Sequence, residues 1–184
     1  MERQSIGSSI SNVRSGEVWK EEAVYYDGNR FFSDLCEALS SAKRRIDLET
    51  YIFDRDQLGR RILKHLGEAA RRGVRVRLLL DGFGCSQWTD LDLEELGRSG
   101  VEAKFYHPLP WQNPDYRFWR FLTPRRMLLG LWKLNRRNHR KTCVIDGRLG
   151  FLGGLNVSAR HLARTQGEPA WRDTSVRVRG KPLS

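Results

Sequence analysis

A chain of 184 residues is long enough to fold as one domain with a substantial hydrophobic core. Its formal net charge of +11 at pH 7 indicates an anionic partner, either a lipid surface or nucleic acid, with a partnerless basic surface as the alternative. The sequence contains no stretch of about twenty uncharged apolar residues and no N-terminal apolar run of signal-peptide length, so it predicts neither a membrane-spanning helix nor export.

The three cysteines form an odd-numbered set without the spacing of a metal site: Cys36, Cys85 and Cys143. We therefore expect reduced thiols in a cytosolic setting, and no bound metal. Cys85 lies in a glycine-rich loop that is compatible with exposure to solvent.

Residues 1–16 are rich in Ser, Gly, Asn and Arg and are interpreted as a flexible lead-in to a single domain over residues 17–184. Hydrophobic periodicity then predicts strands alternating with helices. The predicted strands are residues 18–26, 45–53, 74–81 and 101–106, and the predicted helices are residues 30–42, 58–72 and 91–98. Gly73 is a good stop for the second helix, and Thr89 or Asp90 is expected to cap the third.

Two details of these strands bear on the architecture. Glu49 alternates with Ile46, Leu48 and Thr50, so it faces either a cleft or the solvent. The run 78–80 is three consecutive leucines, which predicts burial on both faces, as in a parallel sheet. A strand, a helix and a second strand in this order form a βαβ unit.

Residues 108–137 form a basic, aromatic and apolar insertion that Pro114 and Pro124 interrupt, so one long helix is not expected. Such composition is typical of segments that lie in an anionic membrane interface. Stacking of single-stranded nucleic acid bases and core packing with extended arginine stems are the alternatives. The expected membrane contacts are Trp111, Trp119, Arg125, Arg126 and Trp132.

The most informative stretch begins at His139 and continues through Lys141 to Asp146. Residues 142–145 are β-branched and apolar and predict a buried strand, beside which His139 and Lys141 project to the same side. A second strand over 149–152 leads into Gly153-Gly154-Leu155-Asn156, where a backbone can approach a ligand closely. An imidazole can attack phosphorus, and the groups of Lys141, Gly154 and Asn156 suit the phosphate oxygens.

The remaining segment contains fewer signals. His161 has no partner that the sequence reveals and is expected at the surface. Residues 174–179 alternate in the manner of an edge strand.

The pattern His139-x-Lys141-x4-Asp146 followed by Gly-Gly-x-Asn resembles the HKD motif of the phospholipase D superfamily. The similarity is to the N-terminal half of bacterial cardiolipin synthases and covers roughly residues 17 to 181. Three further stretches agree with it: 46–53 (Ile-Asp-Leu-Glu-Thr-Tyr-Ile-Phe), 69–82 and 171–174 (Trp-Arg-Asp-Thr).

The resemblance implies an α/β fold, a phospholipase D-like α/β/α sandwich with a mixed, mostly parallel sheet flanked by helices. It implies phosphatidyl transfer between phospholipids through a phospho-histidine on His139, without a cofactor. Asp173 matches the carboxylate that orients the catalytic imidazole, whereas pairing with Arg172 is the structural alternative. Asp146 would brace the motif from its distal end, and Glu49 would approach the cleft. Expected partners are phosphatidylglycerol and the cytoplasmic side of the cell membrane, where the chain would bind peripherally.

The sequence departs from the family pattern in one respect. Family enzymes use two HKD motifs, and this chain has one. We therefore expect half an enzyme that is completed by a homodimer or by a second HKD-bearing chain. The rival interpretations are a homodimeric phosphodiesterase acting on nucleic acid, which we consider less favoured, and an inactive membrane-binding fragment.

Overall fold

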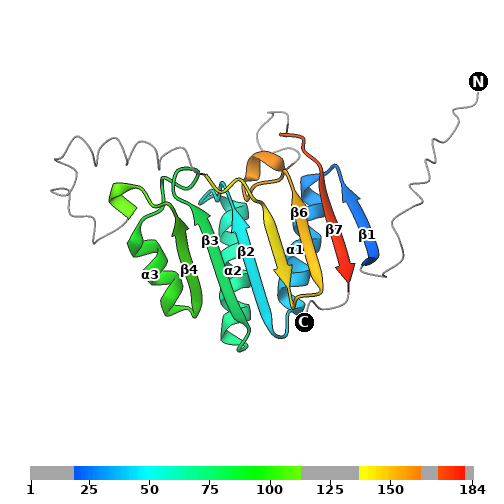
Figure 1. Cartoon of the computed structure of the whole chain (residues 1–184), viewed down its shortest axis with the longest axis horizontal. Coiled ribbons are helices and arrows are strands. Elements are labelled where there is room, and N and C mark those ends of the chain that lie inside the picture. The colour runs from blue at the N-terminus through cyan, green and yellow to red at the C-terminus, as the bar shows by residue number, and fades with distance from the viewer. Residues whose placement is uncertain (1–18, 113–136, 163–169, 181–184) are drawn as a thin grey trace, which may run out of the picture.

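The computed structural model describes residues 19–112, 137–162 and 170–180, in which seven strands form one sheet of order β1-β7-β6-β5-β2-β3-β4 (Figure 1). The strands are β1 (Trp19–Tyr25), β2 (Arg45–Thr50), β3 (Arg75–Asp81), β4 (Val101–Tyr106), β5 (Thr142–Ile145), β6 (Leu149–Gly153) and β7 (Ser175–Gly180). The helices are α1 (Gly28–Ser41), α2 (Gln57–Arg71) and α3 (Asp90–Arg98), with short 3-10 turns η1 (Pro110–Gln112) and η3 (Ala159–His161). Each predicted strand and helix in this part is present within a few residues of its expected ends.

The sheet is mixed, as predicted, but its pairings are mostly antiparallel. Strands β2, β3 and β4 are parallel neighbours, whereas β5, β6, β7 and β1 join through antiparallel pairs. In the described sheet, β5 and β7 alone run against the other strands, so the prediction of a mostly parallel sheet is right for the directions of the strands. It is wrong for the hydrogen-bonded pairs of neighbouring strands. The β5–β6 hairpin accounts for one antiparallel pair, since a tight turn can only join antiparallel strands. The pairs β2–β5, β6–β7 and β1–β7 join strands that are more distant in the chain.

Strand β7 lies between β1 and β6, so the prediction of an edge strand is wrong. Within the described sheet the edges are β1 and β4. Residues 174–179 alternate between apolar and polar side chains because one face of the strand packs on the core, and this pattern does not require a position at the edge of the sheet.

Helices α1 and α2 lie behind the sheet in Figure 1, and α3 packs beside β4. The buried core includes Phe32 and Leu39 of α1, Ile62 and Leu66 of α2, and the side chains of Ile46, Val76, Leu78 and Phe151 from the same sheet face. Leu93 and Leu96 of α3 pack against this core too. The described residues therefore form two layers and contain no helix on the other face, where a sandwich of three layers would have one.

The leucine run of β3 is not buried on both sides, because the described residues place helices on one face of the sheet only. Leu78 and Leu80 are buried against the helices, whereas Leu79 on the opposite face is half-buried. Its neighbours on that face are charged, including Asp47 and Arg77, which form an ion pair.

Each helix begins at a polar cap. Asp27 accepts a hydrogen bond from the backbone N of Asn29, and Asp56 accepts one from Gly59. Thr89 caps α3, with the Asp92 carboxylate accepting from both its backbone N and its hydroxyl. Gly73 ends α2 at φ +85, as predicted.

All three cysteines are buried, including Cys85, which is fully shielded from solvent beneath the carbonyl of Tyr51. Its loop position therefore does not expose it. Burial raises the pKa of the Cys36 and Cys143 thiols, and it raises that of Cys85 to about 12.

Candidate active site

His139 and Lys141 of the HKD-like motif lie at the end of the sheet where β2 and β3 finish and β5 begins, which is the top of the sheet in Figure 1. Since β5 is antiparallel to β2, with Thr142 paired to Glu49, the segment that enters β5 lies beside the segment that leaves β2. His139 and Lys141 precede β5 rather than lying within it. The first is exposed and the second is half-buried.

A buried carboxylate fixes this entry segment. Asp81, which is fully buried at the end of β3, accepts hydrogen bonds from the backbone N–H groups of Phe83 and Gly84 through Oδ1. Its Oδ2 accepts from the backbone N of Asn138 at 2.8 Å. One side chain therefore ties the loop after β3 to the residue before His139, and the cost of burying its charge is offset by these donors.

Asn138 carries the link onward to β2. Its Nδ2 donates to Glu49 Oε2 at 3.2 Å, and the same oxygen lies 3.9 Å from a guanidinium nitrogen of Arg140. Glu49 is thus half-buried beside the entry segment instead of facing bulk solvent alone. Sequence reasoning did not single out Asp81 or Asn138, although a lone acid at the end of an apolar strand was an available signal.

The imidazole of His139 stacks on the ring of Tyr51, with centroids 4.2 Å apart and planes 15° apart. Lys141 Nζ lies 5.6 Å from the centroid of the same ring and donates a hydrogen bond to the His139 carbonyl at 2.9 Å. Tyr51, which leaves β2, therefore serves as a common support for both motif side chains. Sequence analysis places Tyr51 within the predicted strand 45–53 and assigns it no role in the site.

Lys141 is also influenced by Asp173. Partial burial lowers the pKa of Lys141, and the negative charge of Asp173 opposes that shift. Asp173 packs against Gly154, where a β-carbon would lie 2.0 Å from the carboxylate. Asp173 Oδ1 accepts from the backbone N of Thr174 at 2.7 Å.

The structure differs from the expected contact between Asp173 and His139. In the described part of the chain no hydrogen bond joins these side chains, and Asp173 acts on Lys141 instead. Both groups nevertheless belong to the same end of the sheet, since β7 begins there beside β6.

Asn156 is buried and held from two sides. Its Oδ1 accepts from the backbone N of Ile52 at 3.1 Å, and its backbone N donates to His161 Nε2 at 3.3 Å. With Oδ1 occupied, the Nδ2 end of the side chain is the part that can donate to a phosphate oxygen. The backbone N–H of Asn156 is directed to His161 and is not available to a ligand.

His161 is buried, so the prediction of a surface position is wrong. Nε2 accepts from Asn156, and Nδ1 lies 3.3 Å from the carbonyl of Trp171 and donates to it in the same tautomer. Arg160 in turn lies over the ring of Trp171. Tertiary packing supplied both partners of His161, and neither is adjacent to it in sequence.

Asp146 lies at the opposite end of β5 from His139. Its carboxylate accepts hydrogen bonds from the backbone N–H groups of Lys43, Arg44 and Arg45, at 3.0, 2.7 and 2.9 Å. Partial burial acts to raise its pKa, but the three N–H donors outweigh it and hold the pKa below its usual value. The geometry gives this motif residue a bracing contact and no contact with the reacting end.

Of the expected membrane contacts, only Trp111 lies among the described residues. It is 60% exposed, and its Nε1 donates to the Ser86 carbonyl at 3.1 Å. Trp119, Arg125, Arg126 and Trp132 fall outside the described residues, as do the lead-in 1–16 and most of the insertion 108–137. No described helix is both long enough and apolar enough to cross a bilayer.

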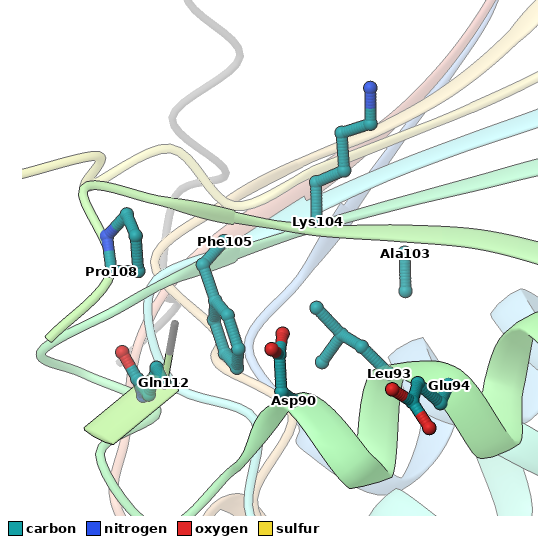
Figure 2. A pocket seen from close by; sticks show the side chains of 8 residues that line it. All are labelled: Asp90, Leu93, Glu94, Ala103, Lys104, Phe105, Pro108 and Gln112. Atoms are coloured by element: carbon teal, nitrogen blue, oxygen red, sulfur yellow. The ribbon is translucent and has the colours of Figure 1, made fainter. Parts of the chain in front are cut away.

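A cavity of about 430 Å³ lies apart from these residues, between α3 and β4 (Figure 2). None of the motif residues lines it. Its lining consists of Asp90, Leu93, Glu94, Ala103, Lys104, Phe105, Pro108 and Gln112. The described residues also contain no group of three or more His, Cys, Asp or Glu placed to hold a metal ion.

Comparisons with known proteins place the chain in one family. A family model described as "Cardiolipin synthase, PLD-like domain" matches residues 35–178. Cardiolipin synthase B of Salmonella typhi is 37% identical over 155 residues, which are 84% of this chain and 33% of that protein. The cardiolipin synthase of Geobacillus kaustophilus is 36% identical over 165 residues, which are 89% of this chain and 29% of that protein. The chain thus spans about a third of the length of these curated relatives.

Among solved structures, NucT from Helicobacter pylori superposes with a TM-score of 0.59 at 15% identity. The alignment covers 86% of this chain and 85% of that one. At such low identity the similarity establishes a shared fold.

Proposed function

Because this chain belongs to the family of cardiolipin synthase domains of phospholipase D type, we propose that it carries one half of a phosphatidyl-transfer site. The observation that carries the proposal is the pairing of His139 with Lys141 over Tyr51, at 4.2 and 5.6 Å from its ring centroid. The Nδ2 end of Asn156 supplies a neutral donor nearby. This set contains a nucleophile, a cation and a hydrogen-bond donor, as phosphoryl chemistry requires.

In the first step, a ring nitrogen of His139 attacks the phosphorus of a donor phospholipid. A nitrogen–phosphorus bond forms, and the bond from phosphorus to the headgroup oxygen breaks. The electron pair leaves with that oxygen, which takes a proton from a general acid. Lys141 and Asn156 donate to the non-bridging oxygens. The phosphatidyl group is then held on His139 as a phospho-histidine.

In the second step, the hydroxyl of an acceptor lipid attacks the same phosphorus and displaces His139. The group that served as acid now accepts the hydroxyl proton. We propose that this group is a second HKD histidine, contributed by another copy of the chain or by a separate chain. With phosphatidylglycerol as donor and acceptor, the products are cardiolipin and glycerol.

Asp173 supports this chemistry through Lys141. Its negative charge opposes the loss of the lysine proton that partial burial promotes. The orienting contact with His139 that the family resemblance implies requires the Asp173 side chain to leave Gly154. We propose that contact for the substrate-bound state.

Both substrates are phospholipids, so we propose peripheral binding to the cytoplasmic side of an anionic membrane. The net charge of +11 and the exposed Trp111 support this location. Binding to vesicles of phosphatidylglycerol is expected to weaken with added salt.

The test measures molar mass in mild detergent and phosphatidylglycerol turnover on the same column fractions. We expect cardiolipin formation only in dimeric fractions, and none after His139→Ala. The variant should still bind phosphatidylglycerol vesicles, which separates lost chemistry from lost folding. Turnover that survives His139→Ala would contradict the assignment of the nucleophile.

A second candidate is a homodimeric phosphodiesterase of the same superfamily acting on nucleic acid. Its support is size, since this chain aligns with 86% of Nuc from Salmonella typhimurium, a phospholipase D family member, at 18% identity and a TM-score of 0.55. Hydrolysis of a DNA phosphodiester by the dimer, without cardiolipin formation, would favour this candidate. An inactive membrane-binding fragment would bind vesicles without either activity.

A further inference from the structure

Arg137, two residues before His139, has a guanidinium group with an unsatisfied hydrogen-bond donor. Its guanidinium lies over the ring of Phe83, 4.6 Å from the centroid, where β3 leaves the sheet. Its Nη1 is shielded from solvent and has no hydrogen-bond partner. Among the described residues, no carboxylate forms an ion pair with it.

An unpaired, partly desolvated guanidinium is costly unless an acceptor reaches it. Phe83 is 54% exposed and Arg137 is half-buried, so a ligand can approach the pair from solvent. The Phe83 ring contacts one side of the guanidinium, and the N–H groups that it does not cover can donate hydrogen bonds. The group that suits such an edge is a phosphate oxygen pair, which accepts two parallel hydrogen bonds.

The position of Arg137 relates this cation to the proposed transfer site. Arg137, His139 and Lys141 are alternate residues of one segment, and each has an aromatic ring beneath it: Phe83 for the first and Tyr51 for the other two. In extended backbone, residues two apart are separated by roughly 6–7 Å. The buried Asp81 binds both the backbone N of Asn138 and that of Phe83, so one carboxylate fixes the spacing between the two supports.

We propose that Arg137 binds a second phosphate, the phosphodiester of the acceptor phospholipid, while the donor phosphate is held at His139 and Lys141. The acceptor role rests on the proposed function. Transfer between two anionic lipids brings two phosphates together, and Lys141 neutralises only one of them. Arg137 supplies the second positive charge and selects an acceptor that carries a phosphodiester over a neutral alcohol or water.

The test compares two short-chain lipids below their micelle concentrations: phosphatidylglycerol with one phosphate, and cardiolipin with two phosphates joined by glycerol. Calorimetry in the His139→Ala background measures binding without chemistry. We expect the two-phosphate lipid to bind the Arg137-containing protein at least about tenfold more tightly than the one-phosphate lipid, because two subsites act together. Arg137→Gln should remove that gain, and Arg137→Lys should retain part of it.

Arg148→Gln is the matched control. Arg148 is exposed beyond the far end of β5 and has the same charge, so its loss tests general electrostatics alone. Equal effects of Arg137→Gln and Arg148→Gln would overturn the proposal. The proposal would also be overturned if the two-phosphate lipid still bound more tightly than the one-phosphate lipid after Arg137→Gln. A third contradicting result would be an affinity for inorganic phosphate or a dinucleotide that depends on Arg137 and is as high as the affinity for the lipids.

A second arm separates this inference from the proposed function. In dimers that turn over phosphatidylglycerol, Arg137→Gln should lower the ratio of cardiolipin to the hydrolysis product phosphatidic acid by about tenfold. An unchanged ratio would contradict the acceptor role. If no preparation is active but the binding gain still depends on Arg137, the proposed function fails and the second phosphate site stands.

Discussion

The imidazole of His139 lies nearly parallel to the ring of Tyr51, at a centroid distance of 4.2 Å. An exposed histidine in front of a strand would otherwise sample several rotamers. The stack restricts it, and the same ring lies beneath Lys141. A residue that leaves β2 therefore orients two residues that enter β5.

Replacing Tyr51 by leucine should release His139. Aromatic pairs contribute about 0.5–1.5 kcal/mol beyond area burial, so we expect up to about a tenfold loss in any transfer activity. The ring-current shift of the His139 proton signals in NMR spectra should also disappear. Tyr51→Phe is the matched control, and it should retain both the shift and the activity. Unchanged His139 signals in Tyr51→Leu would show that no stacking exists in solution.

Removing the charge of Asp173 should lower the pKa of Lys141 further. Burial already lowers this pKa, and Asp173 opposes the shift. In Asp173→Asn, Lys141 should lose its proton at a lower pH than in the parent protein. As the pH is raised, phosphate binding that depends on the charge of Lys141 should therefore weaken at a lower pH in the variant than in the parent protein. NMR titration of the 15N-labelled lysine Nζ measures this directly. Glu94→Gln on α3 is the control and should leave the Lys141 titration unchanged.

Loss of the Asp146 carboxylate should destabilise the chain without touching the reacting end. Three backbone N–H groups lose a charged acceptor in Asp146→Asn, which should cost about 1–3 kcal/mol in the free energy of unfolding at pH 7. Asparagine tolerates the φ of +54 at this position, so backbone strain contributes little. Urea denaturation provides the measurement.

The same variant gives a pH signature. The folded-state pKa of Asp146 lies below its usual value, so its stabilisation is present above the unfolded pKa and is lost as the pH falls through the folded pKa. The stability gap between the parent protein and Asp146→Asn should therefore narrow as the pH drops from 7 to about 3. A gap that is independent of pH would indicate that the carboxylate charge is not the stabilising feature.

Two replacements of His161 should separate its two contacts. Glutamine can place an oxygen near the Nε2 position and accept from the backbone N of Asn156, whereas asparagine can place a donor near Nδ1 for the Trp171 carbonyl. Both should lose about 1–3 kcal/mol of stability, since one buried group is left unpaired in each. Only His161→Asn should shift the Asn156 amide signal strongly and weaken phosphate binding. Equal shifts in both variants would mean that His161 acts through packing alone.

The cysteines should be unreactive in the folded chain. All three are buried, and burial raises each thiol pKa, that of Cys85 to about 12. A thiol reagent such as DTNB at about pH 8 should therefore label none of them quickly, because the thiolate is the nucleophile. Labelling of all three is expected after denaturation. Rapid labelling of one native thiol would show that its loop opens.

The sequence alone determined the elements and the motif. Periodicity predicted the strands and helices of the described residues within a few positions, because each depends on neighbours at spacings of two to four residues. The pairing of His139 with Lys141 and the family resemblance were likewise local patterns. The sequence predicted a cap for α3 at Thr89 or Asp90, and the structure has it at Thr89. Gly73 as the stop of α2 followed from the left-handed conformation that glycine tolerates.

Only the tertiary structure decided which residues meet at the site. Tyr51 beneath His139, Asp81 on Asn138 and His161 on Asn156 are contacts set by strand order and burial, which no local pattern reports. The same cause explains the errors: Cys85 and His161 are buried by distant segments, and β7 is enclosed by β1 and β6. A residue's own neighbours in sequence fix its backbone, whereas the segments that pack on it fix its solvent exposure, hydrogen-bond partners and pKa.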